Sequence, residues 1–422
     1  MKILWITNII LPPVCKKLGL PEPVMGGWMY SLLASLIQES DAQFAVATLY
    51  SGTELKKIEV DKVTYYLLPN KGTNFRYNPT LEIFWQQINH EFNPNIVHLH
   101  GTEYAHGLFF LKSCPDVTSV VSIQGLVTVI STLYYYAGIS GATIWKNISI
   151  RDVLRWDNLF QAKKKMAKRG ENERRIIQSA NHIIGRTNWD KAHTTFMNSK
   201  AEYHFCNEPL RAGFYENNWC FDTCEKHTLF VSQAGYPIKG LHQVLKAVWL
   251  LKSKYPDIKI KVAGQDITAS KTWKEKIRIG GYGSYIKKEI QKLRLEKHIQ
   301  FIGLLNEKEM INQYLKTNLF VCPSSIENSP NSLGEAQILG VPLIASYVGG
   351  VPDMVEEGVS GFMYRFEEVE ILASAIDKVF SMNKNDLTKL SENERITASK
   401  RHDKKVITQQ MIDTYAKILS SK

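Results

Sequence analysis

Short apolar runs alternate with stretches of helical periodicity along most of the chain. The series begins with the run Lys2–Ile6, and an apolar stripe from Trp28 to Ile37 follows at helical spacing. Further runs lie at residues 44–47, 64–68, 96–100, 120–123 and 181–185. Strands of parallel sheets are buried on both faces and read as near-continuous apolar runs, and their alternation with helices is typical of βαβ units. The pattern therefore predicts an α/β protein with doubly wound sheets.

A second series of the same kind begins at Thr228–Val231 and indicates a second domain. The segment from Cys206 to Lys226, between the two series, has no periodicity, so we place the domain boundary there. A length of 422 residues is sufficient for two such domains, each with its own core. The last helix carries an apolar face that runs from Val406 to Leu419.

The net charge of +11 implies an anionic partner. The basic residues are densest in one block, made up of Lys163, Lys164, Lys165, Lys168, Arg169, Arg174 and Arg175. Such a block is most often the solvated face of a helix, and the alternative is contact with an anionic membrane surface. We expect no nucleic-acid partner, because no recognition module for DNA or RNA is legible.

The cysteines and the uncharged segments bear on the location of the protein. The six cysteines show neither a disulfide framework nor a zinc spacing, which fits a reducing cytoplasm. Met1–Val14 has no small-residue cleavage site, so we interpret it as a first strand rather than a signal peptide. Val117–Trp145 is uncharged, but polar residues and glycines interrupt it throughout. We predict a strand plus a loop there, with Leu133–Tyr136 touching a lipid interface.

The most informative stretch joins an apolar run, Leu319–Cys322, to a predicted helix start. Ser329 is the expected N-cap and Pro330 suits the first helical position. Free backbone N–H groups and the positive end of the helix dipole make such a start a good phosphate site. Glu327 lies before the turn, and Glu335 lies eight positions later inside the helix. One carboxylate could therefore meet a sugar and the other a ribose, with a diphosphate between them.

The spacing of two glutamates alone has little specificity. Glu208 and Glu216 are also eight residues apart, with no helix start between them. The context is specific, because a strand, a Pro-Ser-Ser turn, a Gly-Glu-Ala helix and a Val-Gly-Gly-Val-Pro-Asp segment follow one another from Phe320 to Asp353. This run resembles the donor half of the retaining glycosyltransferases of family 4.

The resemblance implies a GT-B fold, in which two Rossmann-like doubly wound domains face each other across a cleft. It implies an acceptor-side domain at residues 1–210 and a nucleotide-sugar donor domain at 226–402. Residues 403–422 would then form a C-terminal helix that crosses back to the first domain.

The resemblance also implies roles for individual residues. Lys239, in the Lys-Gly turn after the first strand of the second domain, would neutralise the leaving diphosphate. Glu327, Lys239 and Gln124 are the expected catalytic residues. The expected donor-binding residues are Gly26, Gly27, Gly264, Gly303, Asn328, Ser329, Asn331, Ser332, Leu333 and Glu335.

The chain departs from the family pattern at two positions. Ala234 stands where the family usually has an arginine, and Gln124 stands where it often has a histidine, so a titratable group is missing there. His98 and His100 are expected to be core histidines. His106, in a predicted loop beyond a strand, is a weaker candidate for the site.

The resemblance thus implies a retaining glycosyltransferase that uses a nucleotide-diphosphate-sugar donor and a glycan or lipid-linked acceptor, in cell-surface polysaccharide synthesis. No Asp-x-Asp pair suggests a metal site, so we expect neither a metal nor another cofactor. We expect the protein in the cytoplasm, on the inner face of the membrane. The alternatives are a sugar-nucleotide epimerase of the same fold and a non-catalytic nucleotide-sugar-binding protein. A nicotinamide oxidoreductase is disfavoured, because the first strand leads into no Gly-x-Gly-x-x-Gly.

Overall fold

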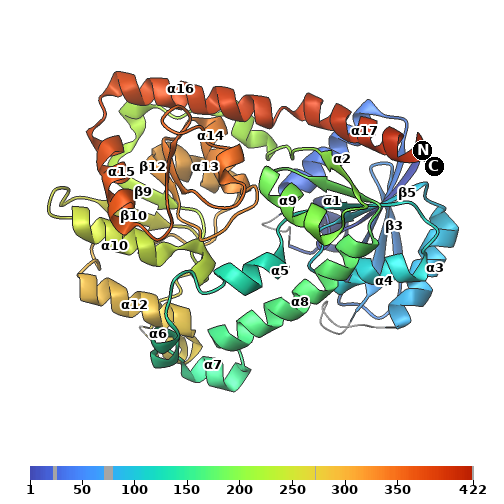
Figure 1. Cartoon of the computed structure of the whole chain (residues 1–422), viewed down its shortest axis with the longest axis horizontal. Coiled ribbons are helices and arrows are strands. Elements are labelled where there is room, and N and C mark those ends of the chain that lie inside the picture. Colours follow the sequence, from blue (N-terminus) through green and yellow to red (C-terminus); the bar gives the residue numbers. More distant parts are fainter. Residues whose placement is uncertain (22–25, 71–78, 271, 421–422) are drawn as a thin grey trace. The chain divides into compact units, whose positions relative to one another are not determined.

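The structure is a computed structural model that describes residues 1–21, 26–70, 79–270 and 272–420. Contacts divide the chain into two compact units (Figure 1). The first unit comprises Met1–Val129, Met166–Leu210 and His402–Lys422, and the second comprises Ile130–Lys165 and Arg211–Arg401. Each unit contains its own sheet, and each is described by itself.

The first sheet has eight strands in the order β3-β4-β2-β1-β5-β6-β7-β8. They are β1 (Lys2–Ile6), β2 (Gln43–Tyr50), β3 (Lys56–Val60), β4 (Val63–Pro69), β5 (Ile96–His100), β6 (Ser119–Ser122), β7 (His182–Gly185) and β8 (Glu202–Phe205). All neighbours are parallel except β3 and β4, which form a hairpin. Asp61 and Lys62 both have positive φ in its turn, as a two-residue hairpin of this twist requires. The predicted α/β architecture is confirmed, with one antiparallel edge strand added.

The helices of the first unit pack their apolar side chains against this sheet. They are α1 (Pro12–Leu18), α2 (Gly27–Glu39), α3 (Thr80–Phe92), α4 (Ala105–Ser113), α5 (Val127–Val129), α9 (Asn188–Met197), α17 (Lys404–Ser420) and the larger part of α8 (Leu159–Ser179). Trp5 is fully buried, and its indole N–H donates to the Tyr415 hydroxyl of α17 at 3.0 Å. Ile407 and Met411 of α17 belong to the same core as Leu32 of α2.

Two local predictions in this unit are wrong. Met1–Val14 was interpreted as a first strand, but β1 ends at Ile6 and Pro12–Leu18 form α1, because proline is tolerated in the first helical turn and Gly19 ends the helix in the left-handed conformation. His106 lies on α4 rather than in a loop. It is buried, with Nε2 3.2 Å from the Thr7 carbonyl oxygen.

The second sheet has six parallel strands in the order β11-β10-β9-β12-β13-β14. They are β9 (Glu225–Val231), β10 (Lys259–Val262), β11 (Ile299–Phe301), β12 (Thr317–Cys322), β13 (Leu343–Ser346) and β14 (Phe362–Tyr364). The helices around it are α10 (Leu241–Leu251), α11 (Trp273–Arg278), α12 (Gly281–Leu293), α13 (Glu307–Lys316), α14 (Asn331–Leu339), α15 (Val369–Ser381) and α16 (Lys384–Arg401). Most of β9 and all of β12 are buried, as the apolar runs predict.

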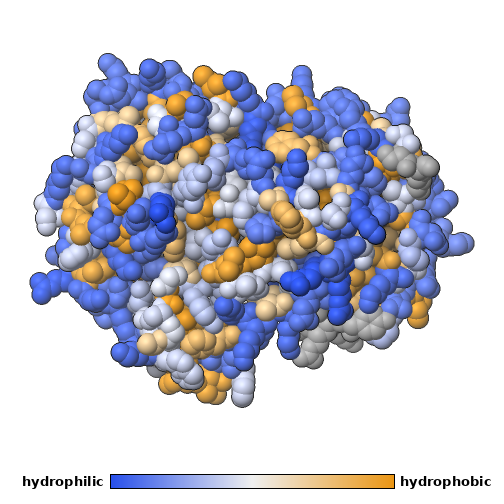
Figure 2. All heavy atoms as spheres, viewed as in Figure 1, coloured by the Kyte–Doolittle hydropathy of each residue, from blue (hydrophilic) through white to orange (hydrophobic). Residues whose placement is uncertain are grey.

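The segment 130–165 belongs to the second unit, whereas the predicted first domain, 1–210, includes it. It holds a π-helical turn at Ile130–Tyr134, then α6 (Gly141–Lys146) and α7 (Ile150–Arg155), so the expected loop contains short helices. His242 Nε2 of α10 lies 2.9 Å from the Ala137 carbonyl oxygen, and the Ser325 hydroxyl donates to the Tyr134 carbonyl at 3.2 Å. Figure 2 shows hydrophobic atoms among hydrophilic ones where α6 and α7 lie in Figure 1.

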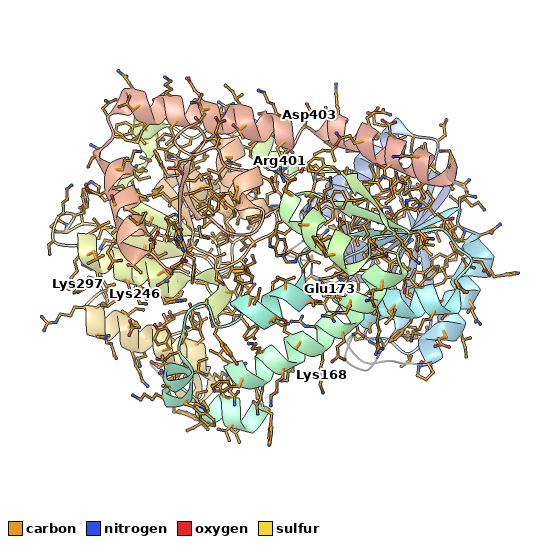
Figure 3. All side chains as sticks on the ribbon, viewed as in Figure 1. Lys168, Glu173, Lys246, Lys297, Arg401 and Asp403 are labelled. Atoms are coloured by element: carbon orange, nitrogen blue, oxygen red, sulfur yellow. The ribbon has the colours of Figure 1, made fainter. Side chains whose placement is uncertain are left out.

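A buried carboxylate holds the start of the loop after β6. Glu173, labelled on α8 in Figure 3, accepts hydrogen bonds from the Thr102 hydroxyl at 2.9 Å and from the N–H groups of Val127 and Thr128 at 3.1 and 2.8 Å. Burial raises the pKa of Glu173, and these hydrogen bonds oppose the shift. The backbone just beyond Gln124 is therefore anchored to α8.

In the part of the chain that the structure describes, no helix combines the length and the apolar character that a bilayer span needs.

Candidate active site

Lys239 and Glu327 meet at the topological switch point of the second sheet. The chain runs outward from β9 to β10 and β11, and then returns to β12, which pairs with β9. Lys239 lies in the turn after β9 and Glu327 in the turn after β12. Lys239 Nζ is 2.6 Å from Glu327 Oε1. Ligands of doubly wound sheets bind in the crevice at such a switch point, beyond the carboxyl ends of the strands.

The surrounding backbone positions Glu327 closely. The Ser324 hydroxyl donates to its Oε1 at 2.7 Å, and the Gly350 N–H donates to its carbonyl oxygen at 3.0 Å. Gly349 has a φ of +51°, and a Cβ there would lie 1.9 Å from the same carbonyl oxygen. Only glycine allows the Val-Gly-Gly segment to pass this close to the Glu327 backbone.

The environment keeps Lys239 charged. Burial opposes its charge, but the adjacent Glu327 carboxylate outweighs this and raises the pKa of Lys239. An ammonium group has three N–H donors, so the bond to Glu327 leaves donors for a second anion. The lysine side chain remains 19% exposed, which leaves it accessible to a ligand.

The helix after Glu327 starts one residue later than predicted. The N-cap of α14 is Pro330, whose carbonyl oxygen accepts from the Leu333 N–H at 3.0 Å, so Ser329 is not the N-cap. The Ser329 hydroxyl instead donates to Met354 Sδ at 3.6 Å and accepts from Arg401 Nη2 at 3.3 Å. Pro330 can cap the helix with its backbone because an N-cap residue needs extended backbone angles and no N–H.

The start of α14 still presents the features that an anion requires. Asn331 and Ser332 occupy the first two helical positions, where backbone N–H groups have no acceptor within the helix, and the helix dipole is positive there. Leu333 is fully buried, so only its backbone can serve a ligand, and the side chains of Asn328 and Ser329 are largely buried as well.

Glu335 pairs with an arginine that the sequence analysis did not identify. Nε and Nη2 of Arg211 both lie 2.8 Å from Glu335 Oε1. Burial raises the pKa of Glu335 to about 7, and Arg211 opposes the shift. Arg211 lies in the aperiodic boundary segment, 124 residues away in sequence, and no local pattern links it to Glu335.

Gly264 and Gly303 are neighbours at the carboxyl ends of β10 and β11. The Gly264 N–H donates to the Gly303 carbonyl at 2.8 Å, and both residues have positive φ. A Cβ at either position would meet no heavy atom within 4 Å, so both backbones face open space. That is what close approach of a ligand to the sheet requires.

In the first unit, Gln124 belongs to a cluster of charged residues at the carboxyl ends of β6, β7 and β8. Gln124 Nε2 donates to Glu208 Oε1 at 2.8 Å, and Glu208 forms a buried ion pair with Arg186 Nη1. Arg186 also donates to the Gln124 carbonyl at 3.1 Å. Arg186 and Glu208 were not predicted, although each closely follows a strand in the position where α/β sites lie.

The other predicted residues of the first unit are two glycines at the start of α2 and two histidines in the core. Gly26 is the N-cap of α2 with a φ of +83°, and Gly27 is the first helical residue. His98 is buried between the Tyr415 and Ser122 hydroxyls, at 2.6 Å from each, and His100 is buried beside it, so both are core histidines as expected.

Residues 217–397 match the family model described as Glycosyl transferases group 1. Over this segment, which is less than half of the chain, the protein is similar to the group 1 glycosyl transferases. The group 1 segment contains Lys239, Glu327 and Glu335, and the predicted resemblance to a GT-B glycosyltransferase is confirmed. Assignment to family 4 stays a prediction.

Curated relatives match over part of their length. Spore coat protein SA of Bacillus subtilis is 26% identical over 159 residues, which are 37% of this chain and 40% of that protein. A D-inositol 3-phosphate glycosyltransferase of Corynebacterium urealyticum is 25% identical over 150 residues, 34% of this chain and 32% of that protein. A putative colanic acid biosynthesis glycosyltransferase of Salmonella typhimurium is 22% identical over 179 residues, 41% of each. The matches thus span less than half of these relatives.

Solved structures match over the whole chain. Sucrose-phosphate synthase from Thermosynechococcus elongatus is similar with a TM-score of 0.71 and 15% identity over 100% of both chains. Anabaena HepE in complex with UDP and glucose has a TM-score of 0.64 and 15% identity, over 99% of this chain and 100% of that one. At such identities the likeness shows the fold, and the predicted GT-B fold is confirmed.

Proposed function

We propose that this chain is a retaining glycosyltransferase that moves a sugar from a nucleotide-diphosphate-sugar donor to a hydroxyl of a glycan or lipid-linked acceptor. The observation that carries the proposal is the Lys239–Glu327 pair at the switch point of the second sheet, in the turn before α14. The segment that matches the group 1 family includes both residues. HepE, which shares the fold, was solved with UDP and with UDP-glucose, so a UDP-sugar is the first donor to test.

The chemistry requires charge stabilisation at the leaving group. The bond between the sugar C1 and the diphosphate oxygen breaks, and negative charge grows on the diphosphate. Lys239 and the N-terminal N–H groups of α14 stabilise that charge. The acceptor oxygen forms the new bond to C1 on the same face through an oxocarbenium-like state, and its proton passes to the departing diphosphate. Glu327 holds Lys239 in place and faces the sugar.

Donor binding is tested first by thermal stabilisation across a panel of nucleotides and nucleotide sugars. A ligand at about a hundred times its dissociation constant adds roughly 2.7 kcal/mol to the free energy of unfolding. We expect a nucleoside diphosphate and its sugar conjugate to stabilise the chain and the free sugar to have no effect. Absence of stabilisation by every nucleotide would contradict the proposal.

Product analysis with donor and no acceptor separates the three candidate functions. A transferase slowly hydrolyses the donor to free sugar and nucleoside diphosphate. An epimerase yields a new sugar nucleotide, and a non-catalytic binding protein leaves the donor unchanged. We expect hydrolysis, lost in Lys239→Ala.

We propose further that the protein rests on an anionic membrane surface on the cytoplasmic side. Cys114, Cys206, Cys220, Cys224 and Cys322 form no disulfide, which is typical of a reducing compartment. The similarity to a putative colanic acid biosynthesis glycosyltransferase supports a role in cell-surface polysaccharide synthesis, with a lipid-linked acceptor as one of the two acceptor classes that we propose. A membrane contact would hold the enzyme near such acceptors.

The contact surface that we propose is α7 with the adjoining ends of α6 and α11. Ile150, Val153 and Leu154 form an apolar stripe at helical spacing, and they are 66%, 62% and 72% exposed. The charged residue Asp152 is buried instead. A surface helix usually buries its apolar residues and exposes its polar ones, so α7 has the opposite arrangement. Beside them, the indoles of Trp145, Trp156 and Trp273 are 69%, 74% and 68% exposed.

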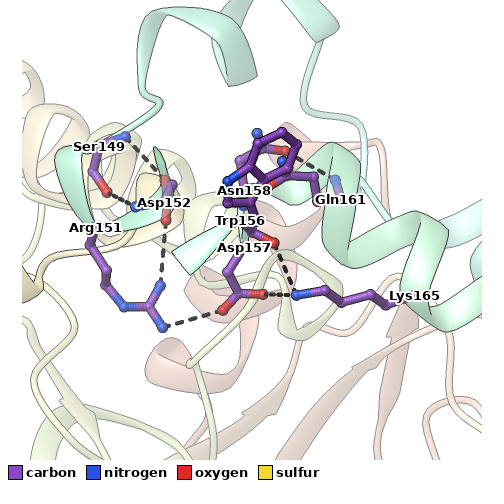
Figure 4. Close-up of polar contacts among 8 residues, drawn as sticks. All are labelled: Ser149, Arg151, Asp152, Trp156, Asp157, Asn158, Gln161 and Lys165. Carbon is purple, nitrogen blue, oxygen red and sulfur yellow. Dashed lines mark hydrogen bonds and ion pairs between the residues drawn. The ribbon is translucent and has the colours of Figure 1, made fainter. Parts of the chain in front are cut away.

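Arg151 and Lys165 form ion pairs within and just beyond α7 (Figure 4). Arg151 contacts Asp152 and Asp157 at 3.4 Å each, and Lys165 donates to the Trp156 carbonyl at 3.0 Å. Arg155 is exposed. Exposed tryptophan and aliphatic side chains among Lys and Arg suit insertion into an anionic interface without spanning it. By contrast, three of the four residues of the predicted contact segment Leu133–Tyr136 are half-buried, and only Leu133 is exposed.

A further inference from the structure

Two imidazoles and a carboxylate meet on one face of the first sheet. His182 of β7 pairs in register with Glu202 of β8, and His204 is two residues further along β8, so all three side chains share a face. His182 Nδ1 lies 3.1 Å from His204 Nε2. Glu202 Oε2 lies 3.6 Å from His182 Nδ1 and 4.0 Å from His204 Nε2. Three potential ligand atoms therefore surround one point.

These separations suit a tetrahedral metal ion. Bonds of about 2.0–2.1 Å place the ligand atoms of a tetrahedral Zn²⁺ roughly 3.3 Å apart, and small side-chain movements bring all three atoms to that spacing. Two imidazole nitrogens and one carboxylate oxygen are a common donor set for Zn²⁺, with water as the fourth ligand. We propose that His182, Glu202 and His204 bind a divalent transition-metal ion of the Zn²⁺ class.

The surroundings of the cluster fit this role. The His182 and His204 side chains are 12% and 6% exposed, whereas that of Glu202 is 39% exposed, so an ion can enter beside the carboxylate. Lys417 of α17 lies 2.6 Å from Glu202 Oε1, and both short distances to the histidines involve Oε2. The lysine thus holds one oxygen and leaves the other for the metal, as an outer partner of a ligand does.

The location indicates a structural ion rather than one that acts on the donor diphosphate. His182 and Glu202 are the first residues of their strands, at the amino edge of the sheet, whereas Gln124 follows the carboxyl end of β6. β8 is the last strand of the sheet and pairs only with β7 within the described sheet. An ion held by His182 on one strand and by Glu202 and His204 on the other would pin this edge strand.

The test is calorimetric titration of the chelator-treated, tag-free full chain with Zn²⁺. We expect one ion per chain, a higher melting temperature, and with Co²⁺ the visible absorption of a four-coordinate site. His182→Gln and His204→Gln should each weaken binding by more than the 10- to 100-fold that loss of an outer partner causes. His227→Gln is the matched control, because His227 lies 2.9 Å from Asp257 but belongs to no three-ligand group in the described residues.

A second measurement covers the case in which a variant fails to fold. In the unaltered chain, Zn²⁺ should shift the NMR signals of two histidines and protect them from acylation. The proposal is overturned if the wild-type chain takes up no stoichiometric Zn²⁺, if binding survives both substitutions, or if His227→Gln abolishes it as well.

Discussion

Lys239 Nζ lies 2.6 Å from Glu327 Oε1, so two residues with separate expected roles form one charged pair. The pair joins the turn after β9 to the turn after β12, across 88 residues of sequence. A lysine held in this way is oriented before the donor arrives, and pre-positioned charge is what stabilises a developing anion most effectively.

The first prediction concerns this lysine. Lys239→Ala removes the cation beside the leaving diphosphate and leaves Glu327 without its ion pair. Turnover at saturating donor should fall on the order of a hundredfold or more. Steady-state kinetics measure the turnover rate. Lys254→Ala is the control and should keep the wild-type rate, because Lys254 forms an exposed ion pair with Asp377 in the same unit. An unchanged rate in Lys239→Ala would remove it from the mechanism.

The second prediction concerns the ribose. If Glu335 accepts hydrogen bonds from ribose hydroxyls, Glu335→Ala should weaken nucleotide binding by roughly 1.5–3 kcal/mol, the contribution of a hydrogen bond to a charged group. Calorimetry with the nucleoside diphosphate measures this. Glu225→Ala, at an exposed ion pair with Lys261, should bind as the wild type does. Equal affinity of a folded Glu335→Ala chain would contradict the assignment.

The third prediction is a pH dependence of stability. The pKa of Glu335 in the folded chain is about 7, above its ordinary value of 4.5. Between these values the folded chain binds more protons than the unfolded chain, so this group lowers the free energy of unfolding as the pH rises through that window. Glu335→Gln cannot titrate. Compared with Glu335→Gln, the wild type should lose about 3 kcal/mol of its free energy of unfolding between pH 4 and pH 8. Urea unfolding of both chains measures this. If the free energies of unfolding of the two chains differ by the same amount at every pH, the pKa of Glu335 is not raised.

The fourth prediction concerns a glycine of the Lys-Gly turn. Gly240 has a φ of +68°, and a Cβ there would lie 1.7 Å from the Pro323 carbonyl oxygen. Gly240→Ala should therefore destabilise the chain by more than the roughly 1–2 kcal/mol of a left-handed non-glycine residue. Gly235→Ala is the control in the same loop, because its Cβ would meet nothing within 4 Å. Denaturant unfolding of both variants is the measurement, and equal stabilities would contradict the argument.

The fifth prediction concerns the membrane. Co-sedimentation with anionic vesicles should decrease as salt rises, and it should be lost in a variant with Ile150, Leu154 and Trp156 changed to Ser. Changing Lys163, Lys164 and Lys165 to Gln should weaken it tenfold or more, since each basic residue near the surface contributes about 1 kcal/mol. Phe196→Ser is the control, because Phe196 is 93% exposed on α9 of the first unit. Equal recovery with neutral vesicles, or none with either, would contradict the proposal.

The sequence by itself determined the architecture and much of the candidate donor site. Apolar runs such as 319–322 predict buried strands, because parallel strands bury both faces. The Lys-Gly turn and the glutamate before a helix start identify Lys239 and Glu327, because these features are local in sequence. The resemblance over 320–353 rests on the same local features.

The tertiary structure alone decided which charged groups meet. Arg211 reaches Glu335 and Arg186 reaches Glu208 across long separations in sequence, and no local periodicity encodes such pairs. Only packing shows that 130–165 joins the second unit, because its short helices bury residues such as Ile144 against that unit. His182, Glu202 and His204 converge through the register of β7 and β8, which side-chain patterns on the separate strands do not specify.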